Sequence, residues 1–204
     1  MVKSIEFITP THLSKVPENK DLIPLPLIQN WQNSKPQELG VAYVGHNNDG
    51  LHFYTYFEDS DLFDTATEDS KILCQFSSVA EFFILPSGTE TYWEIHLSPN
   101  GFFMDLKIPD NKGFRSQKYN FDDMLNCNSG ASYQVQKGDD FWITDITIPW
   151  SSFQRKDIPF GETWRFAVCR YNYKGSLDEL EYSSTAPLSA LNYHLVEDYN
   201  TLQF

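Results

Sequence analysis

Short runs in which apolar and polar residues alternate, separated by Gly, Asn, Asp and Pro, fill this sequence from about residue 40 onward. The clearest run is YWEIHLS at 92–98, where Trp93, Ile95 and Leu97 fall on one side of an extended chain. PNG then makes a turn into the second run, FFMDLKI at 102–108. The two runs predict a β-hairpin that places Trp93, Ile95 and Leu97 in a core.

Further strands are expected wherever the same period of two recurs. They lie at 41–46, 51–58, 79–85, 131–136, 141–149, 164–173 and 179–184. Only NFDDMLN at 120–126 and PWSSF at 149–153 look like single helical turns. The pattern therefore predicts an all-β fold of about ten strands, with two antiparallel sheets packed face to face as an immunoglobulin-like or jelly-roll-like sandwich.

The first 37 residues differ from the rest, with prolines at 10, 17, 24, 26 and 36. Proline cannot donate a backbone hydrogen bond to a sheet. We therefore expect residues 1–37 to form an extended, irregular arm packed on one sandwich domain at 38–204. A chain of 204 residues fits one such domain.

The charge of the chain restricts its partners. A formal net charge of -13 repels nucleic acid and anionic membranes, so neither is an expected partner. The N-terminal residues show no apolar core of a secretory signal, which predicts a cytoplasmic protein as written, or a secreted one if a leader has been removed. Cys74, Cys127 and Cys169 are widely spaced and are expected to be buried free thiols.

No motif whose spacing forces catalytic groups together is present, so the sequence predicts no enzyme. His46, His52 and His96 lie apart and do not indicate a metal triad. The acidic segment EDSDLFDTATEDS at 58–70 could ligate calcium through several oxygens, although it lacks the order of an EF-hand loop.

Aromatic rings mixed with polar side chains favour a sugar-binding surface, because a sugar offers an apolar face to a ring and hydroxyls to planar polar groups. The tail combines Tyr182, Tyr193 and His194 in this way. Tyr92 is a further candidate on the polar face of its strand, and Arg115 in the loop 111–120 completes the edge of such a site.

Arg170 shares its strand face with Trp164, Phe166 and Val168. A buried guanidinium needs a partner, so Arg170 either pairs with Glu81 or faces a ligand. Trp164 itself, with Trp142 and Trp150, is expected in the core.

Six segments in the order 51–63, 77–88, 91–106, 141–153, 161–173 and 191–204 resemble the family 9 carbohydrate-binding modules and their DOMON-like relatives. The resemblance runs from about residue 38 to the C-terminus. It implies a β-sandwich that binds a polysaccharide or oligosaccharide, such as xylan or cellulose or their chain ends. It also implies a structural calcium ion and service to a glycoside hydrolase, here on another chain.

In such modules two aromatic rings typically clamp a sugar. The resemblance places one ring at Tyr182, or at Tyr193 with His194, and the other at Phe76, which stands near a tryptophan position of the family. Two other functions remain open. One is a DOMON-like sandwich that holds haem through Met104 or Met124 and a histidine. The other is a glycoside hydrolase in its own right.

Overall fold

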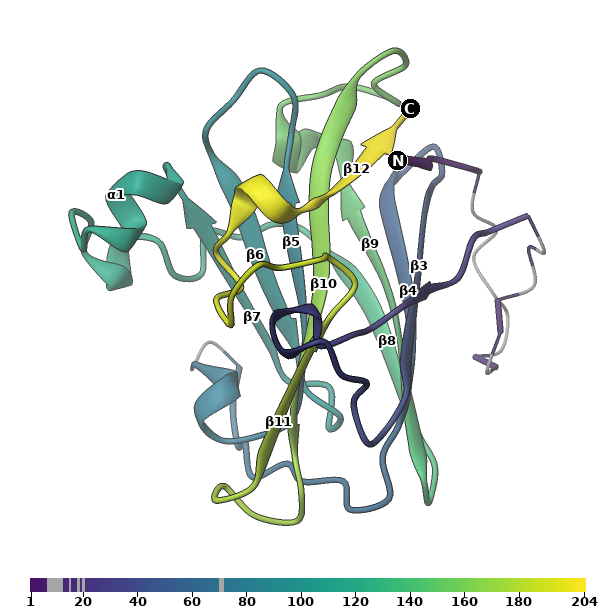
Figure 1. The fold of residues 1–204 in the computed structure, drawn as a ribbon. Helices are drawn as coiled ribbons and strands as arrows, with labels where there is room; N and C mark the ends of the chain where they lie inside the picture. The colour runs from purple at the N-terminus through teal and green to yellow at the C-terminus, as the bar shows by residue number, and fades with distance from the viewer. Residues whose placement is uncertain (7–12, 15, 18, 20, 70–71) are drawn as a thin grey trace.

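The computed structural model describes residues 1–6, 13–14, 16–17, 19, 21–69 and 72–204. In these residues the chain forms two β-sheets that pack face to face, with few and short helical segments (Figure 1). The predicted β-sandwich is confirmed, with twelve strands in the described part of the chain instead of about ten.

The larger sheet, sheet A, has the order β1-β12-β10-β5-β6-β7, and β11 also pairs with β10. All its pairings are antiparallel except that of β1 with β12. Its strands are β1 (Val2–Lys3), β5 (Val79–Leu85), β6 (Tyr92–Leu97), β7 (Phe103–Ile108), β10 (Thr163–Tyr173), β11 (Leu180–Ser184) and β12 (Asn200–Gln203).

The smaller sheet, sheet B, is antiparallel throughout and has the order β2-β3-β4-β9-β8. Its strands are β2 (Leu25–Pro26), β3 (Gly40–His46), β4 (Gly50–Glu58), β8 (Ser132–Lys137) and β9 (Phe141–Pro149).

Helical structure is limited to one short α-helix and five single 3-10 turns among the described residues. They are α1 (Asn111–Arg115), η1 (Asn30–Gln32), η2 (Leu73–Gln75), η3 (Phe121–Asp123), η4 (Trp150–Phe153) and η5 (Val196–Asp198). The predicted turns at 120–126 and 149–153 correspond to η3 and η4. The sequence did not predict α1, which begins after Asp110, whose side chain accepts a hydrogen bond from the backbone amide of Gly113 at 2.6 Å.

The residues of the core between the sheets are those that the alternation of apolar and polar residues in the strands predicts. Trp93, Ile95 and Leu97 of β6 face sheet B and are buried, as predicted. Trp142, Trp150 and Trp164 are buried in the same core, which confirms their assignment. The opposite face of sheet A is buried too, because a second apolar cluster covers it with residues of β5, β6, β7, β10 and the C-terminal segment.

The N-terminal arm is more regular than its prolines suggested. Among its described residues, β1 extends sheet A beside β12, and β2 extends sheet B beside β3. Pro26 lies in β2 at the edge of sheet B, where a missing amide donor is tolerated. Pro10 lies outside the described residues. The arm thus contains two short strands where an irregular segment was expected, and the division of the chain near residue 37 stays a prediction.

Arg170 points into the sandwich, and the predicted pair with Glu81 is wrong. In the register of β10 with β5, Cys169 lies opposite Glu81, so Arg170 and Glu81 occupy opposite faces of sheet A. The guanidinium instead donates to Oδ2 of Asp59 at 2.9 Å and lies over the ring of Phe57. Arg170 is 1% exposed, so its charge is paired inside the core.

The three cysteines are free, but they are not all buried. Cys169 is buried, Cys74 is half-buried and Cys127 is exposed. The prediction of three buried thiols is wrong for Cys127, which follows the η3 turn on the surface.

A cavity on the outer face of sheet A

A cavity of about 520 Å³ opens on the face of sheet A that points away from sheet B. Strands β5, β6, β7, β10 and β11 contribute its floor and one side, while η2, α1, η3 and residues 191–194 form the rim. The lining residues are Ile72, Cys74, Glu81, Glu94, His96, Met104, Leu106, Phe114, Phe121, Tyr171, Tyr182, Leu191, Asn192, Tyr193 and His194.

The period of two explains why polar groups reach this cavity. In β6, Glu94 and His96 alternate with the core residues, so they must project from the outer face of sheet A. Glu81 lies opposite His96 in the register of β5 with β6. The C-terminal segment covers this face because Tyr193 and Tyr199 pack against Phe83 of β5 (Figure 1). The side chains of Glu81, Glu94 and His96 thus lie at the base of a cavity that aromatic residues surround.

Two carboxylates meet one imidazole at the cavity floor. Nε2 of His96 lies 2.7 Å from Oε1 of Glu94 and 3.1 Å from Oε1 of Glu81. All three side chains are more than nine-tenths buried. Burial alone would lower the pKa of His96, but the attraction of Glu81 and Glu94 outweighs it and raises this pKa. The two carboxylates therefore favour the protonated form of His96.

The two carboxylates differ in their affinity for a proton. Burial raises the pKa of Glu81 to about 8, with repulsion from Glu94 adding to the shift and attraction to His96 opposing it. Burial would also raise the pKa of Glu94, but His194 and His96 outweigh it and hold this pKa below its usual value. Glu94 is consequently the permanent anion of the cavity.

His194 is fixed at the rim by three neighbours. Its Nδ1 lies 2.9 Å from the hydroxyl of Tyr92, and its ring centroid lies 4.3 Å from that of Phe114 in α1. The amide of Asn111 donates to its backbone carbonyl at 2.6 Å. Burial lowers the pKa of His194 despite the attraction of Glu94. Nε2 of His194 lies 3.7 Å from Oε2 of Glu94.

Three tyrosines form the opposite wall, with edge-to-face contacts between their rings. The centroids of Tyr171 and Tyr182 are 4.9 Å apart, and Tyr193 lies 5.5 Å from Tyr171. The hydroxyl of Tyr193 donates to the carbonyl of Arg170 and accepts from the amide of Ser183. Tyr193 is thus held by the backbone, while Tyr182 is a half-buried ring on the cavity.

A second hollow of about 360 Å³ adjoins the cavity and shares Tyr182 and Leu191 with it. Trp31 in η1 of the N-terminal arm lies in this hollow beside Glu181 of β11. The amide of Gln29 donates to the carbonyl of Tyr182 at 3.0 Å, which ties the arm to β11. The two hollows thus border each other at Tyr182 and Leu191, with His96 lining one and Trp31 the other.

The predicted site residues fall into three groups. Tyr182, Tyr193 and His194 line the cavity, as the tail pattern indicated. Arg115 lines a third hollow of about 450 Å³, which shares His194 with the cavity. Arg115 is the last residue of α1, not a loop residue as predicted, and its guanidinium lies 3.9 Å from Glu197.

The remaining three residues lie apart from the cavity lining. Tyr92 is completely buried behind His194, so its predicted exposure is wrong. Phe76 is 37% exposed and lies after η2, outside the described lining. Arg170 belongs to the core between the sheets. The binding roles proposed for these residues remain predictions.

Sequence reasoning did not select several cavity residues. The sequence pattern could have indicated Glu81, Glu94 and His96, because each alternates with core residues in its strand and therefore lies on the outer face of sheet A. Tyr171 follows the same rule in β10. Cys74 and Phe114 reach the cavity from the helical segments η2 and α1, and no local pattern indicates that position.

The acidic segment does not present a calcium site in its described residues, 58–69. Oδ2 of Asp59 accepts from Arg170, while Asp64 and Asp69 accept from the backbone amides of Asn100 and Phe103. No three carboxylates converge there in the described part of the chain. These acids do not fit the expected ion, and they instead fasten loops to the sandwich.

No family model matches the chain, and no curated protein matches it. No helix among the described residues is long and apolar enough to cross a membrane.

Solved structures do match it. A "putative carbohydrate-binding protein" from Bacteroides uniformis is similar with a TM-score of 0.73 at 15% identity, covering 100% of this chain and 99% of that one. A family 9 carbohydrate-binding module from Caldicellulosiruptor kristjanssonii in complex with cellotriose has a TM-score of 0.66 at 10% identity, covering 99% and 92%. The fold is that of a family 9 carbohydrate-binding module.

The Caldicellulosiruptor module in complex with glucose gives the same result, with a TM-score of 0.67 at 9% identity and coverage of 99% and 94%. The TM-scores establish the family 9 fold, whereas sequence identities this low do not establish a shared ligand. The likeness spans almost the whole chain, including the described part of the N-terminal arm. The resemblance seen in the sequence is therefore confirmed at the level of fold, and the DOMON-like relation stays a prediction.

Proposed function

We propose that the protein is a non-catalytic carbohydrate-binding module that binds an oligosaccharide or polysaccharide in the cavity of sheet A. One observation carries the proposal: a half-buried tyrosine, Tyr182, lines a cavity that also contains the planar hydrogen-bonding side chains of Glu94, Asn192 and His194. The family 9 fold and the sugars bound by the Caldicellulosiruptor modules support it.

The sugar ring lies with its apolar face on Tyr182, because C–H groups pack favourably on an aromatic face. Its hydroxyls reach the amide of Asn192 and Nε2 of His194. Glu94 accepts from a third hydroxyl, because Oε2 has no hydrogen-bond partner among the described residues. A buried acceptor without a partner is costly, so a sugar hydroxyl gains more there than it would at the surface.

The ligand is longer than one sugar. Strands β5 and β6 form the cavity floor, and the neighbouring hollow, which shares Tyr182 with the cavity, is lined by Trp31. A terminal sugar of a chain fits the cavity while the next units pass over Trp31. We expect a β-linked plant glycan such as cellulose or xylan, recognised at a chain end, and a glycoside hydrolase on another chain as the functional partner.

Catalysis is not part of the proposal. Glu81 and Glu94 both contact Nε2 of His96, so the two carboxylates are bound to one imidazole instead of flanking a bond to be cleaved. Haem binding by His96 and Met104 fits poorly as well. These two residues are paired neighbours on β6 and β7 and project to the same side, whereas axial ligands lie on opposite faces of haem.

A titration tests the proposal. Cello- and xylo-oligosaccharides and a broader glycan panel are added to the protein, and heat and tryptophan fluorescence are recorded. We expect saturable binding that Tyr182→Ala weakens several-fold and that Tyr133→Ala, on the other sheet, leaves unchanged. Absence of binding to every glycan in the panel would refute the proposal, and turnover of an aryl glycoside would refute its non-catalytic part.

A further inference from the structure

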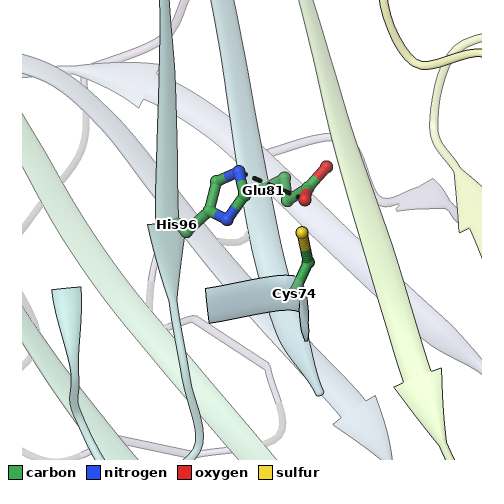
Figure 2. A group of neighbouring side chains, drawn as sticks. All are labelled: Cys74, Glu81 and His96. Carbon is green, nitrogen blue, oxygen red and sulfur yellow. Dashed lines mark ion pairs between the residues drawn. The ribbon is translucent and has the colours of Figure 1, made fainter. Parts of the chain in front are cut away.

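Cys74, Glu81 and His96 point toward one another at the cavity floor, from η2, β5 and β6 (Figure 2). One ligand atom of each residue lies within 4.8 Å of those of the other two. A thiol, a carboxylate and an imidazole form a mixed S, O, N donor set. Within the described residues, this is the one such group of three.

The hydrogen bonding of His96 leaves one ring nitrogen available. Nε2 is occupied by Glu94 and Glu81, whereas Nδ1 is buried and has no hydrogen-bond partner among the described residues. His96 is only 1% exposed, so water does not compensate this atom freely. A carboxylate on one nitrogen of a histidine is also the usual arrangement when the other nitrogen binds a metal, because it fixes the tautomer and the ring orientation.

We propose that Cys74, Glu81 and His96 bind a zinc-type divalent transition-metal ion at the floor of the cavity. Thiolate, imidazole and carboxylate are ligands that Zn²⁺ accepts together, whereas Ca²⁺ and Mg²⁺ select oxygen. The ion takes Nδ1 of His96, the Glu81 carboxylate moves from Nε2 to the ion, and Nε2–H keeps its hydrogen bond to Glu94. When the ion binds, the Cys74 thiol loses its proton to solvent, and so do Nδ1 of a protonated His96 and a protonated Glu81 carboxyl.

Three protein ligands leave a fourth position of a tetrahedral ion open. That position faces the cavity, because all three residues belong to its lining. A water molecule or a hydroxyl of a bound sugar can occupy it. If the cluster were only a hydrogen-bonded group of His96, Glu81 and Glu94, it would explain the contacts of Nε2 and leave Nδ1 without a partner. A bound metal ion also gives a partner to Nδ1 and to the thiol of Cys74.

Metal binding does not depend on the proposed sugar function, so it is tested without sugar. The full chain is treated with a chelator and dialysed, and Co²⁺ is added as a spectroscopic substitute for Zn²⁺. We expect one equivalent of Co²⁺ to produce thiolate-to-cobalt charge-transfer absorption in the near ultraviolet, and Zn²⁺ to abolish it by displacement.

Variants locate the ion. Cys127→Ser, which removes the exposed thiol, should leave the absorption unchanged, and Cys74→Ser should abolish it. Glu94→Gln replaces the charged acceptor that orients His96 with a neutral amide and should weaken Zn²⁺ affinity about 10- to 100-fold. The near-ultraviolet circular dichroism spectrum of each variant verifies that its aromatic side chains remain packed as in the wild type.

X-ray absorption spectroscopy of the zinc-loaded wild type gives an answer that needs no variant. We expect one sulfur at about 2.3 Å together with nitrogen or oxygen at about 2.0 Å. A first shell without sulfur, absence of charge transfer in the wild type, or a signal lost in Cys127→Ser but kept in Cys74→Ser would overturn the proposal.

Discussion

The hydroxyl of Tyr193 donates a hydrogen bond of 2.7 Å to the backbone carbonyl of Arg170. This bond joins the C-terminal segment to the centre of β10, on the face opposite the Arg170 side chain. Because the same hydroxyl accepts from the amide of Ser183, Tyr193 also touches β11. Tyr193 therefore holds one side of the cavity in place, while Tyr182 supplies the ring for stacking.

Replacement of Tyr193 tests this division of roles. Tyr193 is 6% exposed, so Tyr193→Ala should lower the free energy of unfolding by about 3 to 5 kcal/mol. Tyr193→Phe keeps the ring but leaves backbone groups unpaired, at a cost of about 1 to 3 kcal/mol. Denaturant unfolding measures both. Full stability of Tyr193→Ala with impaired sugar binding would instead make Tyr193 a ligand-contacting residue.

The pair of Arg170 and Asp59 makes a second prediction about stability. Asp59 is 1% exposed, so loss of either partner strands a buried charge. Arg170→Met or Asp59→Asn should each destabilise the fold by about 3 to 5 kcal/mol. The double variant should lose less than the sum, which a double-mutant cycle in urea measures. Additive losses would show that the two residues do not interact.

Trp31 tests the path of a longer ligand. If the second sugar unit stacks on Trp31, Trp31→Ala should weaken cellotriose binding by about fivefold, since stacking contributes about 1 kcal/mol. Glucose binding should not change, because one sugar fills only the main cavity. Phe160→Ala, which removes a ring that is 76% exposed, is the control. An equal loss for glucose and cellotriose would contradict the path.

Glu38 should make the free energy of unfolding depend on pH in the acidic range. Burial would raise its pKa, but hydrogen bonds from Lys174, Asn172 and Ser60 outweigh burial and lower the pKa from 4.5 to about 2. A depressed pKa in the folded state stabilises the protein above the unfolded-state value, and this stabilisation disappears as the pH falls from about 4.5 to about 2.

Unfolding free energies measured across this pH range for wild type and Glu38→Gln provide the check. The difference between the two proteins should be constant above about pH 5 and should shrink toward pH 2. Glu90→Gln, at an exposed loop carboxylate, should parallel the wild type. A difference that does not change with pH would show that the ionised form of Glu38 adds nothing to stability.

Much of the fold was predictable because strand periodicity is a local property. The alternation in β6 placed Trp93 in the core correctly, and the same rule put Glu94 and His96 on the opposite face. The rule could not show that this opposite face is covered as well. Its cover comes from α1 and the C-terminal segment, whose positions depend on contacts such as that between Phe114 and His194.

Partners of charged residues were harder to predict. The alternation of β10 correctly placed Arg170 on the same strand face as Phe166. The register of β5 with β10 puts Glu81 on the opposite face and so excludes it as the partner of Arg170. Strand register cannot be read from a single sequence. Asp59 reaches Arg170 from a sequence separation of 111 residues. Cys74 likewise meets His96 only through the packing of η2 against β6.

Backbone chemical shifts during a cellotriose titration test the central claim, sugar binding in the cavity of sheet A, most directly. With ¹⁵N-labelled protein, we predict that the largest saturable shifts fall on residues 191–194 and on β11 around Tyr182, with smaller shifts near Trp31. Amides of β8 and β9 should stay unperturbed. Shifts confined to sheet B, or none at saturating cellotriose and xylotriose, would contradict the account.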